Sequence, residues 1–304
     1  MARLWAVGGV LIISFSAIFV RLAGVAPTTS AFFRASYALP FLLALWLWRR
    51  GPRRRPPRDR LLAVAAGVFL GLDLAFWHRA IDLIGAGLAT VLGNTQVVFV
   101  GLLAWAIHGE RPSRGAGVAI SAVLAGVVLI SGVGTTGAYG QDPRLGVFLG
   151  LLTAMTYSIF LLGLRAASRG LGAPAGPILD ATLGAVLGTV AVGAADGELD
   201  LAITWPAHGW LLALAVGSQV VGWQLIGAAL PRLPALETSV FLLLQPMLTA
   251  VWAWLLFSEL LSGVQIAGMV LVLAGVGWLS ASGSAARPAP STDRPRPGST
   301  EPPS

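Results

Sequence analysis

Two oppositely charged residues lie inside neighbouring apolar stretches of this 304-residue sequence, where ionisable side chains are costly to place. Arg34 lies about six residues into one stretch, and Asp73 lies about eight residues from the facing end of the next. At a helical rise of about 1.5 Å per residue, both side chains would lie about 9–12 Å below the same end. We therefore expect a buried Arg34–Asp73 pair, which either fixes the packing of two helices or serves in gating or substrate binding.

Further polar and aromatic residues in the apolar stretches are candidates for substrate binding or coupling. Trp77 and Trp223 would either stack on an apolar or aromatic ligand in a cavity or pack against helices and lipid. Buried amides either join neighbouring helices by hydrogen bonds or line a cavity. The full candidate set is Arg34, Asp73, Trp77, Asn94, Gln96, Tyr157, Asp180, Gln219, Trp223 and Gln245.

Enzymatic chemistry finds little support in the sequence. There is no cysteine, which excludes disulfides, thiol catalysis and cysteine-bound metals. The three histidines are scattered and form no HExxH motif, and no phosphate-binding loop is present. The residues around Asp73 and Asp180 lack the paired signatures of intramembrane aspartyl proteases. We expect no catalytic residue, no metal and no cofactor.

The elements that must position these residues are membrane-spanning helices. Hydrophobic residues make up 56% of the chain and charged residues 11%, whereas soluble domains carry about 25% charged residues. Spanning a bilayer takes about 20 apolar residues. We therefore predict an all-α membrane protein with ten transmembrane helices, at residues 4–22, 28–48, 61–81, 87–107, 115–132, 145–167, 174–194, 208–230, 236–257 and 264–282. The Pro- and Ser-rich tail 283–304 is expected to be disordered.

The positions of the arginines predict the orientation of these helices. All twenty cations are arginines, and seven of them lie between residues 49 and 60, which is typical of a cytoplasmic loop rather than a nucleic-acid-binding face. With both termini cytoplasmic, sixteen arginines lie on the inner side, and only Arg21, Arg79 and Arg144 lie on the outer side. His78 and Arg79 are then expected at the outer membrane surface. The chain should be a multi-pass protein of the inner (plasma) membrane.

The chain contains an internal duplication. The letters VLAGV occur at Val123–Val127 and again at Val272–Val276, and an ungapped comparison of residues 88–132 with 237–281 gives twelve identities in 45 positions. Five helices per copy, an odd number, place the second copy upside down. We therefore predict two inverted five-helix repeats, residues 1–138 and 139–282, which is typical of secondary transporters with a substrate site between the halves.

The duplication gives Asp180 a particular position. At an offset of 146 residues Arg34 corresponds to Asp180 and Asp73 to Gln219, so no symmetry-related residue offers Asp180 an opposite charge. A carboxylate without a charge partner in a low-dielectric environment favours its protonated form. We expect Asp180 either to exchange a proton during transport or to stay protonated and form a hydrogen bond with Gln219 or Gln224.

Two glutamates at helix ends are expected to be structural. Glu110 and Glu259 lie beside loops, just before the next helix begins. The following Ser262 and Gln265 have the spacing of a capping box, which starts the last helix. Small residues crowd the fifth and tenth helices, which predicts close packing seams and leaves a homodimer contact open.

Several motifs resemble those of the EamA family of the drug/metabolite transporter superfamily. The second helix opens APTTSAFFRASYALP, with Pro27 and Arg34 at family positions, and the fourth ends HGERPS with its acidic Glu110. In the second half, QPMLTAVWAWLLFSELLSGVQIAGMVLVLAGV keeps the family's residues Pro246, Glu259, Gln265, Gly268 and Gly275. The fourth helix lacks the proline that kinks it in many members and reads Asn94-Thr95-Gln96-Val97 instead.

The resemblance implies a secondary transporter. We expect export of small organic metabolites (amino acids, related compounds or drugs) by alternating access, with proton coupling as one option. The alternative is a channel-like facilitator or a lipid or metabolite flippase. The expected partners are a small-molecule substrate, the lipid bilayer and, as one option, a second copy of the chain, but no nucleic acid.

Overall fold

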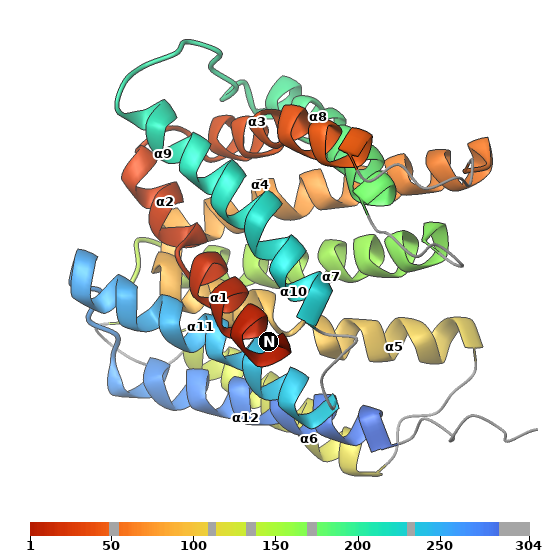
Figure 1. Cartoon of the computed structure of the whole chain (residues 1–304). Coiled ribbons are helices and arrows are strands. Elements are labelled where there is room, and N and C mark those ends of the chain that lie inside the picture. The colour runs from red at the N-terminus through yellow and green to blue at the C-terminus, as the bar shows by residue number, and fades with distance from the viewer. Residues whose placement is uncertain (49–54, 109–113, 132–137, 169–174, 230–234, 286–304) are drawn as a thin grey trace, which may run out of the picture.

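The computed structural model describes residues 1–48, 55–108, 114–131, 138–168, 175–229 and 235–285. Within these ranges the regular structure is entirely helical (Figure 1). The helices are α1 Ala2–Ser14, α2 Ser16–Ala23, α3 Pro27–Trp48, α4 Pro57–Gly93, α5 Gln96–His108, α6 Arg114–Ile130, α7 Pro143–Ala167, α8 Ala175–Asp196, α9 Ala207–Ala213, the π-helix η1 Leu214–Gly222, α10 Trp223–Ala229, α11 Ala235–Phe257 and α12 Gly263–Ala285.

All ten predicted segments are helical where the structure describes them, apart from short interruptions. In the part of the chain that the structure describes, seven helical stretches are long and apolar enough to cross a membrane, and two shorter apolar helices accompany them. The first segment is divided into α1 and α2 at Phe15, and the eighth passes through η1. Conversely, α4 joins the third segment to the start of the fourth, with a break at Gly85, where φ is 83°. The fold is therefore an all-helical bundle with irregular helices.

Local sequence signals explain several helix ends. Asp142 accepts a hydrogen bond from the amide of Leu145 at 3.0 Å and precedes a proline at the first helical position, so α7 begins there. The predicted capping box is confirmed, because the Ser262 amide donates to Gln265 Oε1 and the Gln265 amide donates to Ser262 Oγ. Gln265 also accepts from the Tyr139 amide at 2.8 Å, so this cap holds the connection before α7.

Glycines bring two helix pairs together backbone against backbone. In the seam between α4 and α8, a Cβ added at Gly188 would lie 2.5 Å from the Val68 carbonyl oxygen and 3.2 Å from the Cα of Gly71. In the seam between α6 and α12, Gly126 and Gly268 lie so close that either added Cβ would come within 2.7 Å of the other's carbonyl oxygen. The predicted small-residue seams thus pack helices of one chain against each other.

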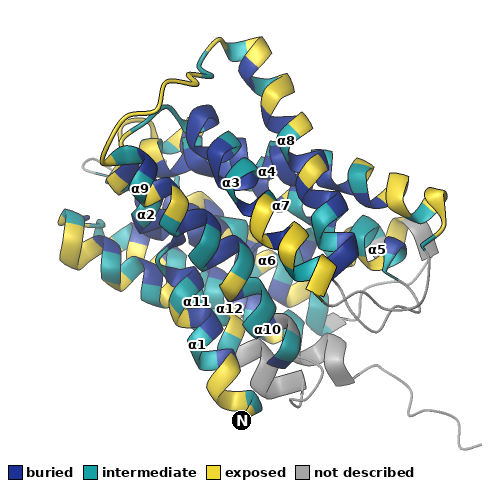
Figure 2. Ribbon diagram, turned by 45° about the horizontal axis from the view of Figure 1, so that its top comes forward, coloured by how far each residue is buried: buried dark blue, intermediate teal, exposed yellow. Residues whose placement is uncertain are grey.

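Exposed residues lie along the outer helices (Figure 2), and many of them are large and apolar. Val118 is 72% exposed, Val270 58% and Trp254 56%, and all three lie on helices of the expected spans. Such exposure is unfavourable in water and favourable in lipid. The burial pattern therefore supports the assignment as a multi-pass membrane protein.

The fourth segment breaks without a proline. Its helix stops at Gly93 and resumes at Gln96, and the Thr95 amide turns back to the Leu92 carbonyl at 2.9 Å. The corresponding helix of the second half, α11, contains Pro246 and runs on without interruption. The two halves therefore differ at this helix. The helix of the first half, which has no proline, is broken, and its counterpart with Pro246 is continuous.

We call the end of the bundle that holds Gly24, Gly85 and Ser258 the outer end, following the orientation predicted from the arginines. The opposite end, where α3 ends and α4 begins, is the inner end.

Candidate substrate site

A buried cationic side chain lies at the centre of the bundle. Arg34, on α3, is 6% exposed, and its Nε donates a 3.4 Å hydrogen bond to Oε1 of Gln219 on η1. Its guanidinium also lies over the ring of Trp77 on α4, 5.5 Å from the ring centroid. Arg34 therefore connects an element of the first half with one of the second.

Asp73 lies near this cation but does not form the predicted ion pair. Within the described residues the Asp73 carboxylate has no ion pair and no hydrogen bond, although it is only 6% exposed. It is close enough to Arg34 and to the Tyr157 hydroxyl to interact with both electrostatically. The two residues are therefore buried near each other but form no direct salt bridge, because Arg34 is directed at Gln219 and Trp77.

Aromatic rings from both halves surround these charged groups. Tyr157, on α7, lies 6.3 Å from Trp223 and 5.6 Å from Phe160, measured between ring centroids. On the other side Trp77 lies 5.3 Å from the ring of His78. The site thus combines a cation, a carboxylate and aromatic faces, a combination that suits small organic molecules carrying both charged and apolar groups.

Irregular helices place polar groups beside this cluster. Gln219 lies in η1, and π-helical turns frequently mark functional positions because they shift the register of one face. The break between α4 and α5 lies on the other side, where Gly93 approaches Trp77 and Thr153. Ser158 Oγ donates to the Gln96 carbonyl at 3.0 Å beside that break. Interrupted helices near the bilayer midplane are typical of transporter binding sites.

Several buried polar atoms around the cluster have no hydrogen-bond partner among the described residues. They are Nη1 of Arg34, Oε1 of Gln96 and Oγ1 of Thr153. Buried polar atoms normally find partners, and leaving one unsatisfied costs about 1–3 kcal/mol. These atoms are therefore available to a bound molecule or to water.

The structure brings together six of the ten predicted site residues. Arg34, Asp73, Trp77, Tyr157, Gln219 and Trp223 form the cluster. Asn94 and Gln96 flank the break next to it, and the Asn94 side chain bonds back to the Thr90 carbonyl at 2.9 Å. Gln245 is half-buried on α11, where its carbonyl accepts from Thr249.

Asp180 lies apart from the cluster and is not an unpaired carboxylate. Its Oδ2 accepts from Nη1 of Arg55 at 2.5 Å and lies 3.5 Å from Nε of Arg60. Arg60 lies at the start of α4 and Arg55 lies just before it, so the partners of Asp180 come from the arginine-rich loop region. The offset of 146 residues relates helix positions of one half to helix positions of the other, so it could not identify a partner in a loop.

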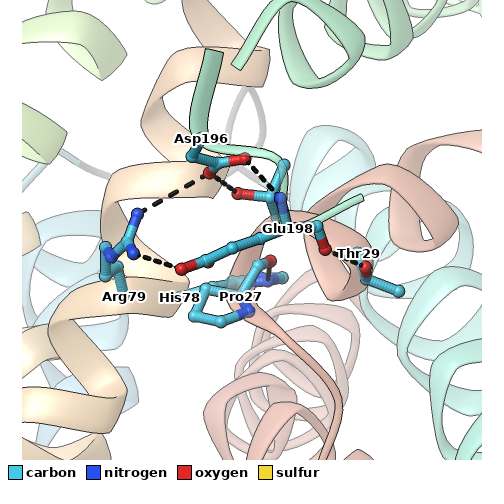
Figure 3. Close-up of polar contacts among 7 residues, drawn as sticks. Pro27, Thr29, His78, Arg79, Asp196 and Glu198 are labelled. Atoms are coloured by element: carbon cyan, nitrogen blue, oxygen red, sulfur yellow. Dashed lines mark hydrogen bonds and ion pairs between the residues drawn. The ribbon is translucent and has the colours of Figure 1, made fainter. Parts of the chain in front are cut away.

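His78 is also placed differently from the prediction. It is fully buried rather than at the membrane surface, and its Nδ1 lies 3.3 Å from the Pro27 carbonyl oxygen. Arg79, next in the chain, does reach the outer end, where it pairs with Glu198 and lies 3.6 Å from Asp196 (Figure 3). Thr29 Oγ1 donates to the Glu198 carbonyl, so this network fastens the loop after α8 onto α3 and α4.

Glu259 is a structural residue, as predicted, with more partners than its sequence position indicates. Its carboxylate accepts from the Ala86 amide at 2.9 Å and from the Gly87 amide at 3.4 Å, and it pairs with Arg21. Glu110 lies outside the described residues. Among the described residues no group of His, Asp and Glu side chains is arranged to hold a metal ion.

A bundle of long apolar helices that encloses a polar cluster is the architecture of a multi-pass membrane transport protein. The chain belongs to the EamA-like transporter family, whose pattern matches residues 1–132 and again residues 144–281. The resemblance noted in the sequence is thereby confirmed.

Individual relatives agree with this assignment. An uncharacterized transporter of Archaeoglobus fulgidus is 32% identical over 151 residues, which are 48% of this chain and 50% of that protein. An uncharacterized transporter of Synechocystis sp. is 27% identical over 293 residues, 91% of this chain and 84% of that protein. A crystal structure with 17% sequence identity has the same fold, with a TM-score of 0.60 over 91% of this chain and 97% of that chain.

Proposed function

We propose that the protein is a secondary active transporter of the inner (plasma) membrane that exports small organic molecules by alternating access. The observation that carries this proposal is the site itself. Arg34, Asp73 and Trp77 come from the first half of the chain, and Tyr157 and Gln219 come from the second. A site divided between two halves changes its access when one half moves against the other.

The inverted arrangement of the halves is part of the proposal. It is supported by the twelve identities between residues 88–132 and 237–281, and by the family pattern that matches each half separately. Five helices per half turn the second copy over. Two related halves packed in opposite directions have two conformations of similar energy, one open to each side.

The chemistry of the cluster favours substrates with an acidic group, a basic group and an apolar or aromatic body. Arg34 offers a guanidinium whose Nη1 is unpaired, and Asp73 offers a carboxylate without a hydrogen bond. Trp77 and Trp223 offer flat apolar faces. Amino acids and related compounds fit this description better than purely cationic drugs, which carry no acidic group to bind Arg34.

Transport would be tested by counterflow in proteoliposomes that contain the purified protein. We expect labelled amino acids to accumulate transiently when the vesicles are preloaded with the unlabelled compound, because a carrier returns faster when loaded. A growth screen of overexpressing cells against toxic amino-acid analogues would narrow the substrate. A channel-like facilitator gives flux without acceleration from the far side, and that result would refute the carrier mechanism.

A further inference from the structure

At the outer end of the bundle, one carboxylate connects three helices. Glu259 follows α11, and the positive φ of 53° at Ser258 turns the chain so that Glu259 points back into the bundle. Its side chain is 2% exposed, accepts from the Ala86 and Gly87 amides of α4, and pairs with Arg21 of α2. A single side chain therefore makes polar contacts with both α2 and α4.

The contact with α4 is a helix cap supplied from a distant part of the chain. The helix breaks at Gly85 and resumes at Ala86, which leaves amide N–H groups without partners inside the helix. A carboxylate at such an N-terminus is stabilised by the helix dipole. Glu259 fills the space next to Gly85 so closely that a Cβ there would lie 2.5 Å from Oε2. The cap is therefore a fixed part of the packing.

The contact with α2, in contrast, joins Glu259 to a short helix of eight residues. The helical hydrogen bonds are interrupted at Phe15, which separates α2 from α1. At the outer end α2 is held by side-chain contacts, with Arg21 over the Phe257 ring at 4.2 Å and Phe19 stacked 6.1 Å from Trp210. Movement of α2 about Phe15 requires Arg21 to leave Glu259.

A second ionic network at the same end has no such freedom. Arg79 on α4 pairs with Asp196 and Glu198, which end and follow α8 (Figure 3). Because glycines pack α4 and α8 backbone against backbone, these two helices stay together whatever their side chains do. This network provides a matched comparison for Arg21 and Glu259.

A pocket beside the Arg21–Glu259 pair indicates what the pair closes. The pocket has a volume of about 230 Å³ and is lined by Arg21, Ile81 and Gly85, among others. Ile81 is 1% exposed and lies one helical turn beyond Trp77 on the same face of α4. Ile81 therefore lies between this pocket and Trp77 of the site.

We propose that Arg21 and Glu259 form the latch of the outer gate. Release of Arg21 from Glu259 lets α2 swing about Phe15 and opens the path past Ile81 to the site, while Glu259 stays on α4 as its cap. This inference rests on the proposed alternating-access function, because it assigns the contact that one of the two states must break.

The test uses a chain that naturally lacks cysteine. Ile81→Cys introduces a single thiol, and its reaction with a membrane-impermeant maleimide from the outer side measures opening of the gate. Arg21→Met removes the ionic pair but leaves Glu259 on α4, so it isolates the latch from the cap. Glu259→Gln alters both, and Glu198→Gln changes the neighbouring network as a control.

We expect Arg21→Met to raise the labelling rate at least about fivefold, which is the effect of about 1 kcal/mol on the open population. Its melting temperature should fall less than that of Glu259→Gln, because the two amides of α4 still stabilise the Glu259 carboxylate. Glu259→Gln should raise labelling and lower the melting temperature, and Glu198→Gln should leave labelling unchanged. If Arg21→Met labels like the parent, or if Glu198→Gln labels as fast as Arg21→Met, the latch is refuted. Labelling measures opening of the gate and does not require transport. It therefore tests the latch even if the counterflow assay shows no transport.

Discussion

At the scale of single residues, the charged side chains in the bundle differ in how fully their hydrogen-bonding and ion-pairing capacity is used. Arg34 has one long hydrogen bond to Gln219 and an aromatic face, and Asp73 has no hydrogen bond among the described residues. Asp180 instead binds an arginine directly at 2.5 Å. A group whose bonding capacity is already used contributes to folding, whereas one with capacity left can bind a substrate.

Arg34→Lys tests the geometry of the cation. Lysine keeps the positive charge but loses the planar fork that reaches Gln219 and stacks over Trp77. We expect an apparent substrate affinity about tenfold weaker, corresponding to the loss of about 1.4 kcal/mol, with a normal melting temperature. Concentration dependence of counterflow would measure it. Unchanged affinity would place the substrate elsewhere.

Asp73→Asn and Asp180→Asn separate coupling from stability. Because the Asp73 carboxylate has no hydrogen bond or salt bridge among the described residues, Asp73→Asn should abolish flux driven by a pH gradient while exchange of substrate continues. Asp180→Asn breaks a buried ion pair and should lower stability by about 3 kcal/mol with gradient-driven flux retained. Flux assays with an imposed pH gradient and thermal melts would distinguish the two. The opposite result would return the coupling role to Asp180.

At the scale of elements, the sequence predicts regular helices better than irregular ones. Length and hydropathy locate all ten segments, and Ser262 with Gln265 predicts the start of α12 because a cap depends on neighbours in the sequence. The break at Asn94 and the π-helix η1 carry no such local signal. They depend on packing against other helices, and so do the Arg55 contact with Asp180 and the Glu259 contact with α4.

Gly188→Ala tests the seam between α4 and α8. The added methyl group would lie 2.5 Å from the Val68 carbonyl oxygen, a backbone atom that moves only with its helix. We expect a loss of stability of about 3 kcal/mol, at the upper end of typical overpacking effects. Thermal unfolding in detergent would measure it. Gly117→Ala, a helical position with open space around it, is the control and should be neutral.

At the scale of the whole molecule, the two halves share one site and diverge around it. Arg34 has a basic side chain where the second half has Asp180, and α11 is continuous where its counterpart is broken. The number and order of the helices follow from a hydropathy pattern that is visible in the sequence. The site follows from the differences between the halves, whose geometry the sequence alone does not supply.

The predicted orientation is tested by two further cysteines. Leu201 is 61% exposed in the loop after α8, and Arg58 is exposed at the start of α4. In intact cells Leu201→Cys should react with an impermeant maleimide, and Arg58→Cys should react only after the membrane is made permeable. The reverse pattern would overturn the predicted orientation.

The cap that Glu259 places on α4 also bears on how the chain is synthesised and inserted. The amides of Ala86 and Gly87 belong to the first half, but the side chain that satisfies them is made about 173 residues later. Until then only water or lipid headgroups at the outer end can replace it. The first half emerging from the ribosome therefore holds an unfinished helix start until nearly the whole chain has been translated. The first half therefore cannot complete this helix start without a side chain of the second half.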